Sequence, residues 1–285
     1  MSTLRIALPN KGRMERPAAD LLHHSGMRFE KTDRSLSVPV RNVDVELLFV
    51  RTEDIPELVA DGVAGMGITG LDLVEEAGLP VSIALELGFG RCRLAAAVPA
   101  SSLVEDLEGF AGLRIATSHP RVTKRFFADK GIPITPVPLR GSVEVAPRLD
   151  VADAVVDLVS SGSTMRVNGL RPVATLLESQ AVLIERTDLR GAEAALAEQV
   201  ETMLRAVLAG RRRRYLLMNA HTGDVPDLAA IIPGLEAPTV VPLAEEGMVA
   251  LHSVVEVDEV WSVLPKLKEA GASGILVLPI EQLIP

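Results

Sequence analysis

Short apolar runs alternate with helical patterns through the first 188 residues, and this alternation most constrains the fold. The runs lie at residues 4–10, 43–51, 64–70, 92–99, 113–120, 133–141, 152–159 and 180–188. Strands that alternate with helices favour parallel pairing, with helices covering both faces of the sheet. The pattern restarts after Gly90, so we expect two α/β lobes that face each other across a cleft.

The last 73 residues follow a different order. Strand and helix patterns there read strand, helix, strand, strand, helix, strand, which is the βαββαβ order of a ferredoxin-like unit. A long amphipathic helix from residue 191 precedes this unit, and we expect it to end in Arg211 to Arg214, where cations favour a helix C-terminus. The predicted domains are residues 1–91 with 180–210, residues 92–179, and residues 211–285.

Composition excludes some classes of partner. Only 3% of residues are aromatic and the net charge is -9, which argues against nucleic acid. Cys92 is the one cysteine, so neither an internal disulfide nor a thiolate metal site is expected, as in a reducing compartment. No run reaches the roughly 18 apolar residues of a membrane span, and no signal-peptide pattern opens the chain. We expect a cytoplasmic protein with no membrane partner.

Residues 149–164, LDVADAVVDLVSSGST, form the junction most suggestive of a binding site. An apolar strand pattern ends in small hydroxylated residues around one glycine, and a helical pattern follows. Ligands of α/β sheets bind beyond the carboxyl ends of strands, where helix N-termini offer free N–H groups to phosphates. The predicted phosphate loop consists of Ser160, Ser161, Gly162, Ser163 and Thr164.

Two acids precede this loop. Asp153 and Asp157 are four residues apart, so on a strand they share one face. Carboxylates beside a phosphate repel it unless they bind sugar hydroxyls or Mg²⁺, and the combination therefore suits a phosphorylated ribose. The alternative for either acid is a capping or solvated side chain.

At this point the sequence resembles a known family. Residues 141–170, GSVEVAPRLDVADAVVDLVSSGSTMRVNGL, resemble the phosphoribosyl pyrophosphate segment of ATP phosphoribosyltransferase, the first enzyme of histidine biosynthesis. The pieces ALPNKGRM, RTEDIPELVADGVAGMGITGLDLV and RIATSHPRVTKRFF resemble that family in matching order. The stretch PGLEAPTVVPLAEEGMVALHSVV resembles the regulatory domain of its long form, so the resemblance spans most of the chain.

The resemblance implies a fold and a reaction. The fold is two periplasmic-binding-protein-like lobes plus an ACT-like regulatory domain. The reaction joins N1 of ATP to the anomeric carbon of phosphoribosyl pyrophosphate and releases pyrophosphate, with Mg²⁺ as cofactor and no protein nucleophile. Residues 160–164 would hold the 5′-phosphate, while Asp153 and Asp157 would face the ribose and serve as candidate Mg²⁺ ligands beside the substrate pyrophosphate.

The same resemblance, together with positions at strand ends, gives candidate ATP-binding residues. They are Lys11, Gly12, Arg13, Arg51, Asp72, Thr117, Ser118 and His119. Glu144 is a candidate acceptor of a proton from the adenine amino group, and a solvated helix face is its alternative. His119 stands where relatives commonly carry tyrosine, so stacking on adenine could persist with a new pH dependence. Asp150 and Val151 replace a usual glycine-containing GLAD segment, which puts a sharp turn there in doubt.

Regulation is also implied by the resemblance alone. The long form binds histidine as a feedback inhibitor through its C-terminal domain and assembles into hexamers, so a homo-oligomer between dimer and hexamer is expected. The candidate effector contacts are Asn219, Thr239 and Ser273. Asn219 stands where an acid is common in relatives, which leaves a salt bridge to a histidine amine in doubt.

Three other functions fit parts of the pattern. A periplasmic-type solute-binding protein shares the two-lobe architecture but needs export. A prephenate dehydratase-like enzyme also joins a two-lobed region to an amino-acid sensor, but it has no use for SSGST beside aspartates. A non-catalytic amino-acid-sensing regulator requires lost catalysis, which Lys11, Gly12 and Arg13 beside an intact phosphate loop argue against.

Overall fold

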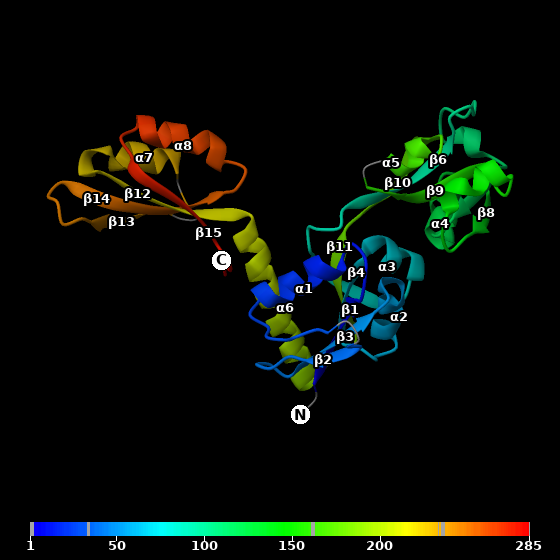
Figure 1. Ribbon diagram of the computed structural model, residues 1–285, viewed down its shortest axis with the longest axis horizontal. Helices are drawn as coiled ribbons and strands as arrows, with labels where there is room; N and C mark the ends of the chain where they lie inside the picture. Colours follow the sequence, from blue (N-terminus) through cyan, green and yellow to red (C-terminus); the bar gives the residue numbers. More distant parts are fainter. Residues whose placement is uncertain (1–2, 33–34, 161–162, 233, 235–236, 285) are drawn as a thin grey trace. The chain divides into compact units, whose positions relative to one another are not determined.

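The computed structural model describes residues 3–32, 35–160, 163–232, 234 and 237–284, with the backbone alone described for Ser163 and Thr164. The chain forms two compact units, each containing its own sheets and helices (Figure 1). The first unit is Met1–Asp20 with Met27–Ala197, and the second is Leu21–Gly26 with Glu198–Pro285. Each unit is described by itself below.

The first sheet of the first unit has six strands. In spatial order they are β2 (Ser37–Pro39), β3 (Val45–Val50), β1 (Leu4–Pro9), β4 (Met66–Gly70), β11 (Ala181–Arg186) and β5 (Val81–Glu86). Strand β1 pairs in parallel with β3 and β4, whereas β11 is antiparallel to both β4 and β5, and β2 is antiparallel to β3. The expected parallel pairing is confirmed for β1 with β3 and β4 but is wrong for β2, β5 and β11, and β11 runs in the opposite direction because it returns from the second sheet.

Three helices and a short 3₁₀ turn connect the strands of this sheet. They are α1 (Glu15–His24), η1 (Thr52–Asp54), α2 (Ile55–Ala60) and α3 (Leu71–Ala77). Ile55 and Val59 of α2 pack with Ala7 and Val182 in one buried cluster, which fixes α2 against the middle of the sheet. Burial of such aliphatic side chains contributes roughly 1.5–3 kcal/mol each.

The second sheet has five strands. In spatial order they are β10 (Leu170–Ser179), β6 (Cys92–Pro99), β9 (Ala154–Val159), β7 (Arg114–Thr117) and β8 (Thr135–Pro138). Strand β7 is parallel to β8 and β9, while β6 is antiparallel to β9 and β10. The connecting helices are η2 (Glu108–Phe110), α4 (Pro120–Asp129), η3 (Val143–Leu149) and α5 (Ser163–Val167). Residues 143–149 form a 3₁₀ helix that includes Pro147.

Both faces of the second sheet are buried. On one face Leu94, Ala96 and Val156 pack against Phe110 and Phe127. On the other face small residues of β6 and β9 pack against η3 and α5; this cluster includes Ala95, Ala97, Val155, Val143 and Met165. Helices on both faces explain the continuous apolar run of β9, in which Asp157 is the one interruption.

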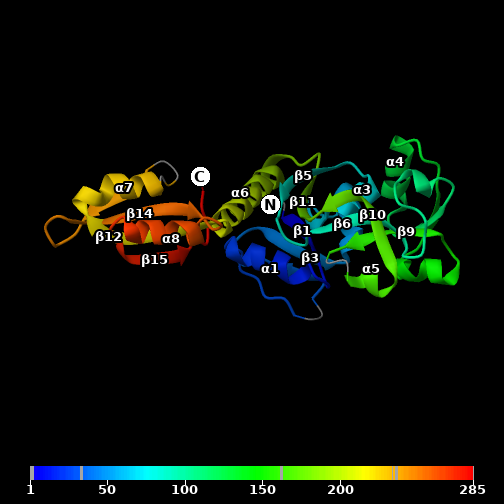
Figure 2. The same ribbon diagram turned by 90° about the horizontal axis from the view of Figure 1, so that it is seen from above.

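The second unit contains the ferredoxin-like order that the sequence predicts. Its sheet runs β13 (Thr239–Pro242), β14 (Met248–Glu256), β12 (Arg213–His221), β15 (Ser273–Pro279), with every neighbour antiparallel. Helices α7 (Val225–Ile231) and α8 (Val260–Glu269) cover one face of this sheet (Figures 1 and 2). A short 3₁₀ turn, η4 (Thr222–Asp224), leads into α7.

The arginine run divides between two elements. Helix α6 (Gly191–Arg211) ends at Arg211, whereas Arg213 and Arg214 belong to β12 and pair with β14. The expectation that all four arginines end the helix is therefore wrong, because Arg213 is instead held across the sheet by Glu256, with 2.8 Å between Nε and Oε1. The predicted domain boundaries stay a prediction. No helix within the described ranges is long and apolar enough to cross a membrane.

Candidate functional site

The carboxyl ends of β7 and β9 lie side by side and bring two candidate residues together. The parallel register ends at the pair Thr117 and Val156, and Ser118 and Asp157 directly follow that pair on the two adjacent segments. Ser118 and Ser160 are exposed there. Ser161 and Gly162 lie outside the described residues, as do the side chains of Ser163 and Thr164, whose backbone opens α5.

Asp157 lies in a mixed electrostatic environment. Burial raises the pKa of its carboxyl above the ordinary value, and the negative charge of Glu144 raises it further. The backbone N–H of Leu158 donates to Oδ1 at 2.8 Å, and this hydrogen bond offsets only part of the rise. Asp157 and Glu144 are thus two neighbouring acids, and a hydroxyl or a cation of a ligand would reduce the repulsion between them.

Asp153 does not join this group. It precedes β9 at the amino end, and the six strand residues that separate it from Ser160 span about 20 Å. Its carboxylate holds the guanidinium of Arg114, with 2.8 Å from Nη2 to Oδ1 and 3.2 Å from Nε to Oδ2. This pairing lowers the pKa of Asp153. The structure therefore gives Asp153 a partner far from the phosphate loop.

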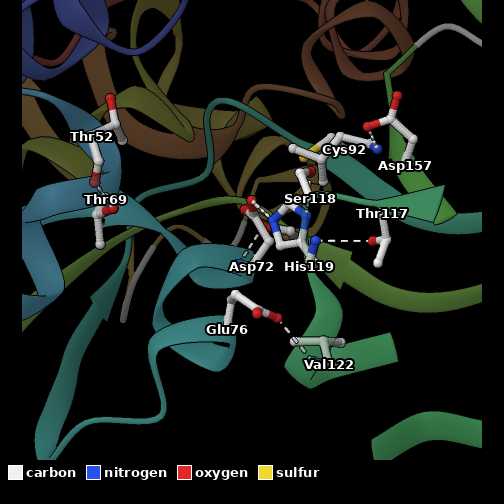
Figure 3. A network of polar contacts seen from close by, with 12 residues as sticks. Thr52, Thr69, Asp72, Glu76, Cys92, Thr117, Ser118, His119, Val122 and Asp157 are labelled. Atoms are coloured by element: carbon white, nitrogen blue, oxygen red, sulfur yellow. Dashed lines mark hydrogen bonds and ion pairs between the residues drawn. The ribbon is translucent and has the colours of Figure 1, made fainter. Parts of the chain in front are cut away.

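Asp72 and His119 meet in a buried polar network that joins the two sheets of the first unit. Asp72 opens α3 and His119 precedes α4, and their side chains point toward one another in Figure 3. The distance from His119 Nε2 to Asp72 Oδ2 is 3.2 Å, and Ser118 Oγ lies 3.0 Å from His119 Nδ1. His119 is only 3% exposed, so its ring does not offer a surface on which adenine could stack.

The other carboxylate oxygen of Asp72 binds Ser179 at the end of β10. The Ser179 hydroxyl donates to Oδ1 at 2.5 Å and accepts the backbone N–H of Asp72 at 3.1 Å. Burial by itself would raise the pKa of Asp72, but the hydrogen bonds from His119 and Ser179 outweigh it and hold that pKa below its ordinary value. Asp72 is thus a buried carboxylate with its charge satisfied.

Thr117 and Glu76 fix the segment around His119. Thr117 is fully buried and its hydroxyl oxygen accepts the backbone N–H of His119 at 2.9 Å. Glu76 of α3 accepts the N–H groups of Arg121 and Val122, each at 2.9 Å, and so caps the N-terminus of α4. The first turn of α4 is therefore occupied by a carboxylate of the protein.

The first loop places the predicted cations at the carboxyl ends of β1 and β3. Lys11, Gly12 and Arg13 are exposed between β1 and α1, and Gly12 has a φ of 84°, which favours glycine. Arg13 donates from Nη2 to the sulfur of Cys92 at 3.0 Å. Arg51 is exposed directly after β3. These residues share the strand-end edge of the first sheet.

The three predicted effector contacts are only partly together. Ser273 donates from Oγ to the backbone carbonyl of Asn219 at 3.3 Å, because β12 and β15 are neighbours. Thr239 lies on β13, opposite His252, with β14 between it and β12. Of the three residues predicted from the sequence, Asn219 and Ser273 are in contact, and Thr239 lies two strands from Asn219.

Some residues of the site carry no sequence signal. Ser179 and Glu76 are ordinary polar residues of a strand and a helix, and only the fold brings them to Asp72 and α4. Ser179 also lines a cavity of about 230 Å³ together with Arg91, Glu178 and Gln180, where the chain passes between the two sheets. Among the described residues, no group of three or more His, Cys, Asp or Glu could hold a metal ion.

Comparisons with known proteins agree with the expected family. A family model for ATP phosphoribosyltransferase matches residues 51–207, and a model for the HisG C-terminal domain matches residues 210–282. The ATP phosphoribosyltransferase of Gemmatimonas aurantiaca is 42% identical over 99% of this chain and 100% of the relative. That of Natronomonas pharaonis is also 42% identical, with the same coverage.

A solved structure gives a third comparison. A chain of the ATP phosphoribosyl transferase (HisG:HisZ) complex from Thermotoga maritima is 26% identical, with a TM-score of 0.60. The match covers 71% of this chain and 98% of that chain. The two full-length relatives at 42% identity separate the chain from the solute-binding and prephenate dehydratase alternatives. The chain belongs to the ATP phosphoribosyltransferase family.

Proposed function

We propose that this protein transfers the phosphoribosyl group of phosphoribosyl pyrophosphate to N1 of ATP, in the presence of Mg²⁺, giving phosphoribosyl-ATP and pyrophosphate. Membership of the family makes the chain a glycosyltransferase of histidine biosynthesis. The observation that carries the proposed site is the juxtaposition of Ser118 and Asp157 at the carboxyl ends of β7 and β9, directly before the predicted phosphate loop.

Each substrate has a proposed place along these strand ends. Residues 160–164 hold the 5′-phosphate. Asp157 accepts hydrogen bonds from ribose hydroxyls, and these bonds are favoured because they offset the repulsion between Asp157 and Glu144. The exposed cations Lys11, Arg13 and Arg51 attract the triphosphate of ATP, because a protein of net charge -9 needs local positive charge to bind a polyanion. Asp153, held by Arg114 at the other end of β9, is left out of this site.

The chemistry needs positioning more than a nucleophile. Attack by N1 on the anomeric carbon passes through an oxocarbenium-like state in which negative charge grows on the departing pyrophosphate. Mg²⁺ carried by the pyrophosphate of the substrate would balance that charge. The protein's part is to align the adenine with the ribose, through Asp157 and Ser118, and to stabilise the leaving group with cations.

Feedback inhibition and self-association are part of the proposal. Histidine binds the second unit near the contacting pair Asn219 and Ser273. Association between copies uses exposed apolar residues of β15, since Leu276, Val277 and Leu278 are 40–54% exposed on a strand at the edge of the sheet. The molar mass in solution, measured with and without histidine, tests this association, and a strictly monomeric protein would contradict it.

The experiment that tests the function is a coupled assay with ATP, phosphoribosyl pyrophosphate and Mg²⁺. It follows both phosphoribosyl-ATP and pyrophosphate, and repeats the measurement with histidine. Equal amounts of the two products confirm the transfer, and a lower rate with histidine confirms feedback. Pyrophosphate released without phosphoribosyl-ATP would indicate hydrolysis and contradict the proposed transfer. A chelator such as EDTA tests the dependence on Mg²⁺.

A further inference from the structure

The side chains of Asp72, His119 and Ser118 form a series of polar contacts that leads from the buried junction of the two sheets to the surface. Asp72 and His119 are 4% and 3% exposed, whereas Ser118 is exposed. Oδ2 of Asp72 lies 3.2 Å from Nε2 of the imidazole, and Nδ1 of the same ring lies 3.0 Å from Oγ of Ser118. Both ring nitrogens of His119 are thus engaged, one by a carboxylate and one by a hydroxyl.

The partners of His119 determine which ring nitrogen carries the hydrogen. The Asp72 carboxylate can only accept, and Ser179 already donates to its other oxygen. Nε2 must therefore carry a hydrogen and donate to Asp72. In the neutral ring Nδ1 is then the acceptor, so Ser118 donates its hydroxyl hydrogen inward. The outward lone pairs of Ser118 Oγ are left to accept a hydrogen from a ligand.

Ser118 lies at the strand ends where the substrates are proposed to bind. The register of β7 and β9 puts Ser118 next to Asp157, the proposed ribose-binding acid. The backbone of the following residue is fixed as well, because His119 N–H donates to Thr117 and Thr123 N–H donates to the His119 carbonyl. A hydroxyl on so constrained a segment is held in one orientation without a ligand.

We propose that Ser118 is a catalytic residue that accepts a proton from the 6-amino group of adenine, with His119 and Asp72 as positioning residues that act through it. This inference rests on the proposed function. As the bond from N1 to the anomeric carbon forms and the bond from that carbon to pyrophosphate breaks, the adenine gains a positive charge. Ser118 Oγ takes one amino hydrogen, its own hydrogen passes to Nδ1 of His119, and neutral phosphoribosyl-adenine in its imino form remains. Solvent removes the proton from the ring after product release.

Carboxyl groups lie around the His119 ring, which accepts the hydrogen from Ser118 in this proposal. Asp72 faces the ring from α3, and Asp157 on β9, with Glu144 of η3 beside it, adds further negative charge. The N-terminus of α4 begins at the next residue and would oppose a cation there, but the Glu76 carboxylate binds its first N–H groups. Loss of Glu76 would therefore weaken the relay without touching the substrate.

The test is the pH dependence of kcat and of the KM for ATP in the full-length protein and its variants. Ser118→Ala removes the acceptor, Ser118→Thr keeps a hydroxyl, and His119→Gln keeps polar contacts but cannot take a proton. We expect kcat to fall roughly 10²-fold in Ser118→Ala and His119→Gln, with KM for ATP changed less than threefold, and largely to recover in Ser118→Thr. The acidic limb of the wild-type kcat profile should shift to lower pH in His119→Gln.

Ser101→Ala is the matched control, because Ser101 is an exposed serine of the same unit outside the network. Ser118 is exposed, so its replacement leaves the core intact, and an unchanged unfolding temperature confirms this. The relay is overturned if Ser118→Ala and His119→Gln raise KM alone and keep kcat with its acidic limb, since that outcome means binding without proton transfer. Wild-type protein that makes no phosphoribosyl-ATP would instead overturn the proposed function.

Discussion

The carboxylate of Glu76 on α3 reaches the first turn of α4, where Oε2 accepts the backbone N–H of Val122 at 2.9 Å. The same carboxylate accepts the N–H of Arg121, so one acid caps a helix that belongs to the other sheet. Its negative charge also lies at the positive end of the helix dipole. The cap therefore contributes both to helix stability and to the junction of the two sheets.

Glu76→Ala should lower the free energy of unfolding by about 1–2 kcal/mol, as the loss of a helix cap does. Glu75→Ala is the matched control, because Glu75 pairs with the half-exposed side chain of Arg125, a contact worth about 0–1 kcal/mol. Denaturant unfolding of both variants checks the difference. Equal losses in the two variants would mean that Glu76 is not a cap.

Asp157→Asn should change stability and activity in opposite directions. The folded-state pKa of Asp157 is raised, so its contribution to stability is present below the unfolded pKa and is lost as pH rises through the folded pKa. At pH 7 the charged carboxylate therefore costs stability, and asparagine should raise the unfolding temperature slightly. Catalysis should fall roughly 10²-fold, because the variant loses the charge proposed to face the ribose.

Asp153→Asn is the comparison for Asp157. Its pKa is lowered by Arg114, so asparagine should leave activity near the wild-type value and lower stability slightly. The two variants are measured for unfolding temperature and for kcat in one buffer at pH 7. A large loss of activity in Asp153→Asn would contradict this and would indicate that Asp153 binds the ribose, as the sequence predicts.

Asp72 should make the protein sensitive to acid. Its folded-state pKa is lowered, so the stability it contributes is present above the unfolded pKa of about 3.8 and is lost as pH falls through the folded pKa. Ser179→Ala removes one hydrogen bond to this buried charge, and we expect a loss of about 1.5–3 kcal/mol at pH 7. The loss should shrink below pH 4, which denaturant unfolding at several pH values can measure.

The effector residues should be coupled in one pair only. Asn219 and Ser273 are in contact across β12 and β15, whereas Thr239 is two strands from Asn219. In a double-mutant cycle on half-inhibition by histidine, Asn219→Ala and Ser273→Ala should be non-additive by a factor of about 2 or more. Asn219→Ala with Thr239→Ala should be additive within error. Additive effects in both pairs would place the effector elsewhere.

Local patterns predict much of this fold. The apolar runs of β1, β3, β4, β6, β7 and β9 are found where the sequence indicates, and so are the helices after β1, β3, β4, β7 and β9. The ferredoxin-like order of the second unit is confirmed as well. The resemblance to the family names Asp72 and His119 as candidates, although not as partners of each other.

The missed elements have physical reasons. Strand β10 contains Pro172, which argues against a strand, and the structure accommodates it where the register with β6 shifts between Pro172 and Ala174. Strand β5 is partly exposed and lacks a continuous apolar run. The pairing of Asp153 with Arg114 joins residues 39 positions apart, and no local pattern carries a contact of that range.

The place of β11 in the first sheet also determines the order in which the chain can fold during synthesis. Strand β11, residues 181–186, lies between β4 and β5, so the first sheet stays open until the ribosome has released those residues. The second sheet needs only residues 92–179, which are continuous in sequence. The lobe that is synthesised second can therefore complete its sheet first. In the first lobe, the edges of β4 and β5 that pair with β11 stay unpaired until β11 has been synthesised.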